Sequence, residues 1–106
     1  MTTVNQPYIF ISHSHQDREF AHFLNERLQR AGFNTWFDVE SIPEGSTWAR
    51  EIEKGVENCG ALITIMSKNA RESEWVERET LLALRLNKPV LIAQIDDTPL
   101  PIYLIN

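Results

Sequence analysis

Four short runs of strand type alternate with segments of helical periodicity along this chain, and this alternation restricts the possible folds more than any other feature. The runs cover residues 8–12, 33–37, 61–66 and 89–95. Most of them are continuously apolar, which is typical of strands buried on both faces. Strands that alternate with helices in this way predict a mostly parallel sheet covered by helices on both faces.

The predicted architecture is a doubly wound α/β sheet, and a flavodoxin-like strand order of 2-1-3-4 fits four such units. In sheets of this class, ligands bind beyond the carboxyl ends of the strands, where the strand order reverses. For this order the reversal lies between the first and the third strand. It places Ser12, His13 and Ser14, which follow the first strand, beside the connector from the third strand to the last helix.

Capping residues and apolar stripes predict three helices between the strands. The expected caps and helix ends are Ser14 with Asp17, Gly32, Ser46 or Thr47, Ser73 and Asn87. The expected apolar stripes are Phe20, Phe23, Leu24, Leu28 and Ala31 in the first helix, and Trp48, Ile52, Gly55, Val56 and Cys59 in the second. Gly55 has no Cβ, so it would let its helix pack closely on the sheet. Residues 67–72 are predicted to form a polar connector.

One acidic residue breaks the pattern of the third predicted helix. On a helix, one sector collects the apolar side chains of Trp75, Val76, Leu82, Ala83 and Leu86. Glu79 falls in the middle of that sector, whereas the other charged residues of the helix point the opposite way. A carboxylate on an apolar face is costly unless it is paired, hydrogen-bonded or at the mouth of a cleft. Glu79 is therefore either a satisfied core carboxylate or a functional group that faces the crevice.

Charge and composition exclude several classes of partner. The formal net charge is −5 and the Lys and Arg residues do not cluster, which argues against nucleic acid or an anionic membrane surface as a partner. The single cysteine, Cys59, excludes an internal disulfide and fits a reducing compartment. No apolar run has the length of a membrane span, and the N-terminus lacks the features of a signal peptide. We therefore expect a cytoplasmic location.

Several familiar sites are missing from the sequence. It contains no glycine-rich dinucleotide loop, no phosphate loop and no His-Glu-x-x-His zinc motif. A receiver domain would need acidic residues after the first strand and an Asp at the end of the third, where Ser12 and Ser67 stand instead. His13, His15 and Asp17 are possible metal ligands, but a convincing fourth ligand is missing, so we expect no metal site.

Three stretches together resemble the Toll/interleukin-1 receptor (TIR) domain family, especially its prokaryotic members. Residues 10–17, Phe-Ile-Ser-His-Ser-His-Gln-Asp, resemble the first conserved box of the family. Residues 36–38, Trp-Phe-Asp, and 42–45, Ile-Pro-Glu-Gly, resemble its second strand and the BB loop that follows. Ser73-Glu-Trp75 with Glu79 resembles the Ser-x-Trp-x-x-x-Glu signature of members that cleave NAD+. The resemblance covers nearly the whole chain.

The resemblance implies that the chain cleaves the bond between nicotinamide and ribose in NAD+, with NAD+ as the substrate and no further cofactor. It implies that Glu79 is the catalytic residue and that Trp75 borders the nucleotide pocket. The residues then expected to bind the nucleotide are Ser12, His13, Ser14, Trp75 and Asp38.

The resemblance also implies that activity follows assembly with other TIR domains, in signalling or anti-phage defence. The residues expected to make these contacts are Ile42, Pro43, Gly45 and Trp48. Leu81 and Leu84 lie off the apolar sector, and we expect the sheet, a partner or both to cover them. We expect residues 1–106 to form a single domain of a longer protein, because relatives continue into a fifth strand and a last helix.

Two other functions stay open at the level of the sequence. A non-catalytic TIR scaffold would bind like domains through the BB loop. A nucleotide sensor of similar topology would bind NAD+ without cleaving it. Glu79 separates the enzyme from the scaffold, because a scaffold has little need of a carboxylate on an apolar face.

Overall fold

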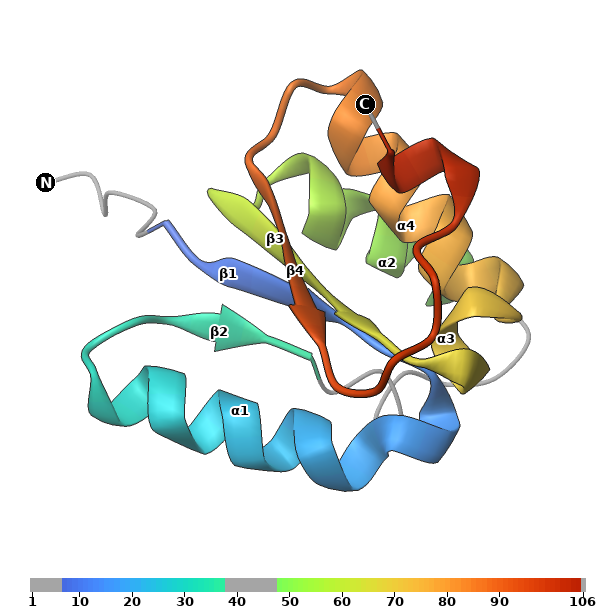
Figure 1. Ribbon diagram of the computed structural model, residues 1–106. Helices are drawn as coiled ribbons and strands as arrows, with labels where there is room; N and C mark the ends of the chain where they lie inside the picture. The colour runs from blue at the N-terminus through green and yellow to red at the C-terminus, as the bar shows by residue number, and fades with distance from the viewer. Residues whose placement is uncertain (1–6, 38–47, 106) are drawn as a thin grey trace, which may run out of the picture.

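The computed structural model describes residues 7–37 and 48–105, apart from the side chains of Trp48 and Ala49. The described strands are β1 (Ile9–Ser12), β2 (Thr35–Trp36), β3 (Ala61–Met66) and β4 (Val90–Gln94). They form one parallel sheet in the order β2-β1-β3-β4 (Figure 1). The predicted strand order is therefore confirmed.

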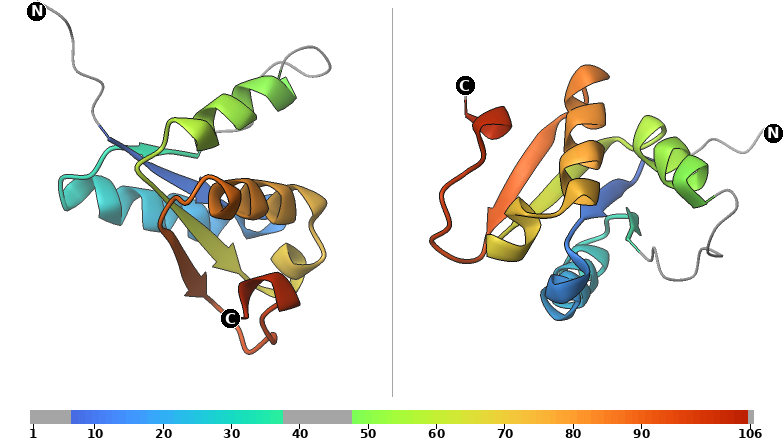
Figure 2. Two further views of the ribbon diagram at one scale, coloured as in Figure 1. Left: turned by 90° about the horizontal axis from the view of Figure 1, so that it is seen from above. Right: turned by 90° about the vertical axis from the view of Figure 1, so that its right-hand side faces the viewer.

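Helices cover both faces of the sheet, as predicted. One face carries α1 (Arg18–Arg30), and the other carries α2 (Trp48–Glu57) and α4 (Glu74–Arg85) side by side (Figure 1, Figure 2). Shorter helical segments in the described residues are η1 (His15–Asp17), α3 (Lys68–Arg71) and η3 (Ile102–Leu104). Within residues 7–37 and 48–105, no helix has both the length and the apolar character that crossing a bilayer requires.

Each face of the sheet has its own apolar core. Neighbouring residues of β1 point to opposite faces, so Phe10 joins one core and Ile11 the other. The core on the α1 side is built on Ile11, Ala21 and Ile65. The core under α2 and α4 is built on Phe10, Ile52, Val56, Cys59, Leu62 and Ala83. Apolar burial on both faces explains the continuously apolar sequences of β1 and β3. The same expectation was wrong for β4, where Leu91 and Ile92 are 53% and 37% exposed.

The packing of α2 on the sheet is close at Gly55, as predicted. A Cβ at this position would lie only 3.0 Å from Cε2 of Phe10 and 3.4 Å from Cζ3 of Trp36. The rings of Phe10 and Trp36 are stacked, with centroids 4.7 Å apart. Cys59 is buried in the same core, and burial raises the pKa of its thiol, as expected for a packed cysteine.

Several predicted helix ends are confirmed. Gly32 and Asn87, each two residues after the end of α1 or α4, adopt left-handed conformations with φ of 96° and 60°. Ser73 caps α4, because its Oγ accepts a hydrogen bond from the amide of Val76 at 3.2 Å. The alternative caps proposed for α2, Ser46 and Thr47, lie outside the described residues.

The start of α1 differs from the prediction. A turn of 3-10 helix, η1, comes first, and Ser14 caps it by accepting a hydrogen bond from the amide of Gln16 at 3.2 Å. The carboxylate of Asp17 accepts a hydrogen bond from the hydroxyl of Ser67. Asp17 therefore ties the end of β1 to the end of β3, a role that the local spacing could not reveal.

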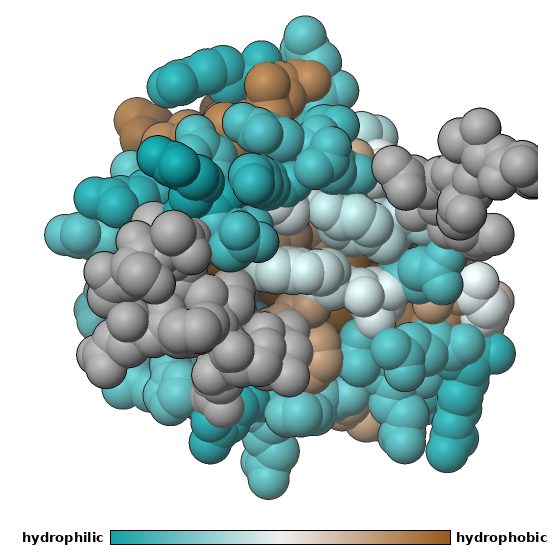
Figure 3. Space-filling view, turned by 180° about the vertical axis from the view of Figure 1, so that it is seen from behind, coloured by the Kyte–Doolittle hydropathy of each residue, from teal (hydrophilic) through white to brown (hydrophobic). Residues whose placement is uncertain are grey.

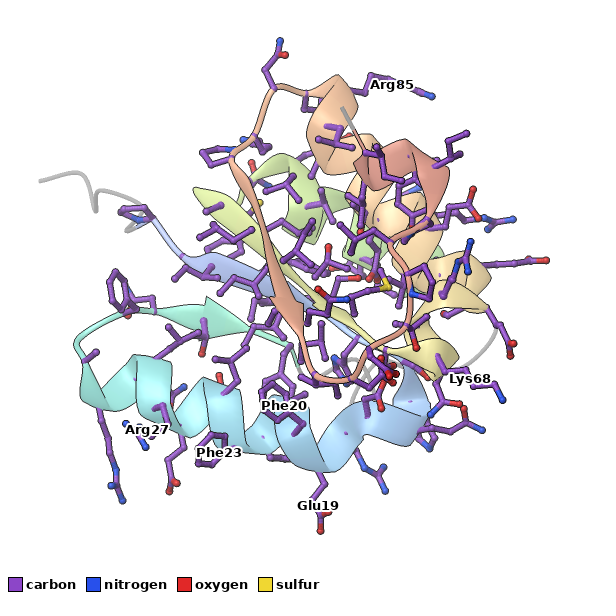
Figure 4. The ribbon with its side chains drawn as sticks, viewed as in Figure 1. Glu19, Phe20, Phe23, Arg27, Lys68 and Arg85 are labelled. Carbon is purple, nitrogen blue, oxygen red and sulfur yellow. The ribbon has the colours of Figure 1, made fainter. Side chains whose placement is uncertain are left out.

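The apolar stripe of α1 was also partly wrong. Phe23 is 53% exposed and Ala31 is exposed, whereas Ala21 is fully buried. Phe20 lies between α1 and the sheet, and Phe23 lies on the outer side with the Arg27 guanidinium 5.6 Å from its ring centroid (Figure 4). Successive helical residues are about 100° apart, so a stripe that includes Ala21 turns Phe23 away from the sheet.

The segment between β3 and α4 is more ordered than the predicted polar connector. It contains α3, which Ser67 caps by accepting a hydrogen bond from the amide of Ala70 at 3.0 Å. Ala70 is fully buried in a small core with Met66 and Val76, which holds this turn against the sheet. At the other end of α4, Leu86 was predicted to belong to the apolar sector, but it follows the last residue of the helix and is 40% exposed.

The left-handed conformation of Asn87 gives a test of the boundary between α4 and β4. We expect Asn87→Ala to lower the free energy of unfolding by about 1 kcal/mol, because a Cβ disfavours this conformation and Ala lacks the compensating amide. Asn87→Gly should be neutral or stabilising. Urea denaturation of the three proteins measures the difference. Equal stabilities of the Ala and Gly variants would contradict this prediction.

Candidate active site

A pocket of about 380 Å³ lies between α2 and α4. Ile52, Glu53 and Val56 form its wall on the α2 side. The wall on the α4 side includes Trp75 and Glu79, which lie one helical turn apart. The pocket therefore combines apolar walls with a few charged groups, as most small-molecule sites do.

Glu79 points inward, toward the sheet. It is only 7% exposed, and its Oε1 accepts a hydrogen bond of 2.6 Å from the hydroxyl of Ser12. Ser12 is the last residue of β1 and is fully buried. The odd carboxylate of α4 thus lies at the carboxyl end of the first strand and also borders the pocket, where a ligand could reach it.

A second buried hydrogen bond runs beside the first. The hydroxyls of Thr64 on β3 and Thr80 on α4 are 2.8 Å apart and both residues are fully buried. Ser12 and Thr64 are paired across β1 and β3, and Glu79 and Thr80 are neighbours on α4. Two adjacent hydrogen bonds from adjacent strands therefore hold α4 in one rotation, with the Glu79 carboxylate over Ser12.

Burial changes the acidity of Glu79. Desolvation raises the pKa of its carboxyl from 4.5 to about 7, while the hydrogen bond from Ser12 acts in the opposite direction. Near neutral pH both protonation states are then populated. The folded state binds this proton more tightly than the unfolded state, so stability falls as pH rises between these two values, by roughly 3 kcal/mol in total. The buried carboxylate lowers the stability of the fold above neutral pH.

Trp75 is half-buried beside Glu79, and one face of its ring is covered. The guanidinium carbon of Arg78 lies 5.4 Å from the ring centroid. Both residues border the pocket. Trp75 also packs against the core under α2 and α4, so the planar guanidinium of Arg78 is the surface on which a ligand ring can stack.

The profile of the TIR domain family matches residues 9–104 of the chain. The chain belongs to the TIR domain family. Its fold is similar to that of the TIR domain of the Toll-related receptor TRR-2 from Hydra magnipapillata, with a TM-score of 0.79 and 22% identity over 91% of this chain and 76% of that one. It is also similar to the TIR domains of the activated Roq1 resistosome, with a TM-score of 0.74 and 22% identity over 89% of this chain and 60% of that one.

Curated relatives of this TIR domain include NAD+-metabolising proteins. The chain is 35% identical over 72 residues to the NAD(+) hydrolase TcpA of Theionarchaea archaeon strain DG-70-1, covering 67% of this chain and 22% of TcpA. It is 30% identical over 90 residues to the 2′ cyclic ADP-D-ribose synthase AbTIR of Acinetobacter baumannii, covering 82% of this chain and 34% of AbTIR. The matched part of the chain thus spans about a fifth to a third of the length of these relatives.

The structure brings together only some of the residues predicted for the nucleotide site of this TIR domain. Ser12, Trp75 and Glu79 lie at or directly beside the pocket. Ser14 caps η1, and His13 lies against Phe37 with ring centroids 5.8 Å apart; neither borders the pocket between α2 and α4. Their contact with a nucleotide stays a prediction. Among the described residues, no three His, Cys, Asp or Glu side chains are grouped as metal ligands.

The predicted BB loop residues of this TIR domain and Asp38 of the predicted nucleotide site lie almost wholly outside the described part of the chain. Asp38, Ile42, Pro43 and Gly45 lie outside the described residues, and Trp48 begins α2 with a side chain that is not described. Leu81 and Leu84 of α4 are 36% and 39% exposed, so the sheet does not cover them, and coverage by a partner stays a prediction. Seen from behind, hydrophobic residues gather at the upper edge of the molecule (Figure 3).

Sequence reasoning missed two sets of residues that shape this site. Thr64 and Thr80 were not singled out, although a threonine beside Glu79 on the inner face of α4 was a usable signal. Arg78 and Arg85 were assigned to the outer face, yet both border the pocket. Their spacing of three from Trp75 and Leu82 could have revealed a continuous stripe along α4.

The hydrogen bond between Thr64 and Thr80 can be tested by a double-mutant cycle. We expect Thr80→Val to lower the free energy of unfolding by about 1–3 kcal/mol, because it leaves the buried Thr64 hydroxyl without its partner. Adding Thr64→Val should recover part of this loss, since both hydroxyls are then replaced by methyl groups. Chemical denaturation measures the four proteins. Strictly additive losses would show that the two hydroxyls do not interact.

The hydrogen bond from Ser12 can be tested through the acidity of Glu79. We expect Ser12→Ala to raise the pKa of Glu79 above about 7, because the hydroxyl stabilises the ionised carboxylate. A pH titration of the Glu79 side-chain carboxyl carbon by NMR measures the shift. Ser14→Ala serves as the matched control, because Ser14 is also buried but caps η1. An unchanged or lower pKa in Ser12→Ala would exclude the proposed stabilisation.

Proposed function

We propose that this TIR domain is the catalytic part of an NAD+ glycohydrolase, which cleaves the bond between nicotinamide and ribose. The observation that carries the proposal is the buried Glu79 carboxylate, held by Ser12 at the end of β1 and bordering a pocket with Trp75. The relatives named as an NAD(+) hydrolase and a cyclic ADP-D-ribose synthase support it, because their similarity extends over 67% and 82% of this chain.

The chemistry explains why a single carboxylate can be sufficient. Ordinary glycosidases use two carboxyl groups, one of which protonates the leaving oxygen. Nicotinamide in NAD+ is a cationic leaving group and departs as a neutral base, so it needs no proton from the protein. The group required is an anion beside the ribose, which stabilises the positive charge that develops at the anomeric carbon.

Glu79 can supply that anion. In its ionised form, the carboxylate would hold the ribose hydroxyls and face the oxocarbenium-like centre. Its small exposure strengthens this electrostatic interaction, because little water screens it. Ser12 acts as a positioning residue, since its hydroxyl fixes one carboxylate oxygen and leaves the other for the substrate. NAD+ is the substrate in this mechanism, and no additional cofactor takes part.

The fate of the ribosyl cation decides the product. Attack by water gives linear ADP-ribose, whereas attack by a second nucleophilic group of the same nucleotide gives a cyclic product. We propose that activity depends on assembly with other TIR domains through the BB loop residues Ile42, Pro43, Gly45 and Trp48. We place this activity in cytoplasmic signalling or anti-phage defence, without nucleic acid or membrane partners.

Removal of the Glu79 charge tests the proposed function. We expect Glu79→Gln to reduce nicotinamide release from NAD+ by at least about a hundredfold, because the amide keeps the shape of the side chain but cannot stabilise the developing cation. In the parent protein, activity should rise with pH around a midpoint of about 7, as Glu79 loses its proton. Chromatography of the nicotinamide released by the concentrated protein measures both effects.

The matched control for this experiment is Glu74→Gln. Glu74 lies on the same helix but is exposed and does not border the pocket, so its activity should equal that of the parent. Full activity of Glu79→Gln would refute the catalytic role. A parent that binds NAD+ without releasing nicotinamide would instead support the sensor function, and a parent that assembles without binding NAD+ would support the scaffold.

A further inference from the structure

The pocket wall on α4 carries two arginines that the proposed mechanism does not use. Arg78 is the residue before Glu79, and Arg85 lies about 9 Å beyond Glu79 along the helix axis, at a rise of about 1.5 Å per residue. Together with Trp75 and Leu82 they form a stripe with a spacing of three or four residues. The carboxylate of Glu79 is therefore flanked along this wall by two guanidinium groups.

Positive charge at this place is unexpected for the chain as a whole. The formal net charge is −5, so the average field of the protein repels an anionic ligand. On the facing wall, α2 contributes the acidic Glu53. A ligand with negative charge would then be drawn to the α4 side of the pocket and away from the α2 side. The charges of the two walls define an orientation for such a ligand.

Arg78 is partly fixed before any ligand binds. Its guanidinium lies over the Trp75 ring, which limits the conformations of a side chain that is otherwise exposed. A fixed planar guanidinium is suited to bind two oxygens of a phosphate at once. Arg85 extends outward from the end of α4, at the rim of the pocket (Figure 4). The Arg85 guanidinium can therefore bind an anionic group of a ligand that is still partly exposed to solvent.

We propose that Arg78 and Arg85 bind the pyrophosphate of the dinucleotide, an inference that rests on the function proposed for Glu79. In NAD+, the ribose that carries nicotinamide is also attached to the pyrophosphate. A ribose held at Glu79 therefore places the pyrophosphate in the pocket between Arg78, on the N-terminal side of Glu79, and Arg85, on its C-terminal side. The two arginines make the pocket selective for a nucleotide that contains a pyrophosphate.

Binding of ADP-ribose to the purified protein tests this inference without any turnover. ADP-ribose contains the pyrophosphate and lacks nicotinamide, and isothermal calorimetry measures its Kd. We expect Arg78→Gln and Arg85→Gln each to weaken binding by about tenfold or more, the usual effect of losing a charged hydrogen bond. Arg71→Gln is the matched control, because Arg71 is exposed on α3 and does not border the pocket.

The outcomes separate this inference from the proposed function. Equal Kd values for the parent and for both pocket variants would overturn the pyrophosphate site, as would a parent that does not bind ADP-ribose. If NAD+ is cleaved and neither variant raises the KM, the enzyme stands and the inference falls. If NAD+ is not cleaved but ADP-ribose binding depends on both arginines, the inference stands and the proposed function falls. Arg85→Gln tests the site without disturbing the contact between Arg78 and Trp75.

Discussion

The hydrogen bond between Ser12 and Glu79 is the interaction on which the site depends. A carboxylate that is 7% exposed loses most of its hydration, and this loss is unfavourable unless a protein group replaces the water. One serine hydroxyl replaces part of it, at 2.6 Å. Glu79 also borders the pocket between α2 and α4, which a ligand can enter. The site thus holds a buried carboxyl group whose ionised form is costly, a group that apolar packing alone would not favour.

The alternation of strands and helices and the inward direction of Glu79 could be predicted from the sequence, because both follow from periodicity. The strand order was instead taken from the known topologies of doubly wound sheets. Continuous apolar runs indicate strands covered on two faces, and a charged residue in an apolar sector of a helix has only one direction in which to point. The caps at Gly32, Ser73 and Asn87 also follow from local chemistry. These features depend on residues that are close in the sequence.

The parts that could not be predicted depend on contacts between distant segments. Ser12 was predicted to bind a ligand, because it ends the first strand. Its hydroxyl instead donates a hydrogen bond to Glu79, which is 67 positions away and could not be identified as its partner from the sequence. Asp17 looked like half of a capping box, but its carboxylate meets Ser67. Phe23 looked like a core residue because it is large and apolar, yet the small Ala21 occupies the face against the sheet. The size and polarity of a residue can be read from the sequence, but the residues that it contacts depend on the fold.

The close packing of α2 on the sheet at Gly55 also affects the pocket between α2 and α4. Because this residue has no side chain, the helix rests directly on the rings of Phe10 and Trp36. The size of the pocket between α2 and α4 therefore depends on how closely α2 packs on the sheet. A larger residue at position 55 would push α2 away from the sheet. The pocket would change in size although none of its lining residues had been substituted.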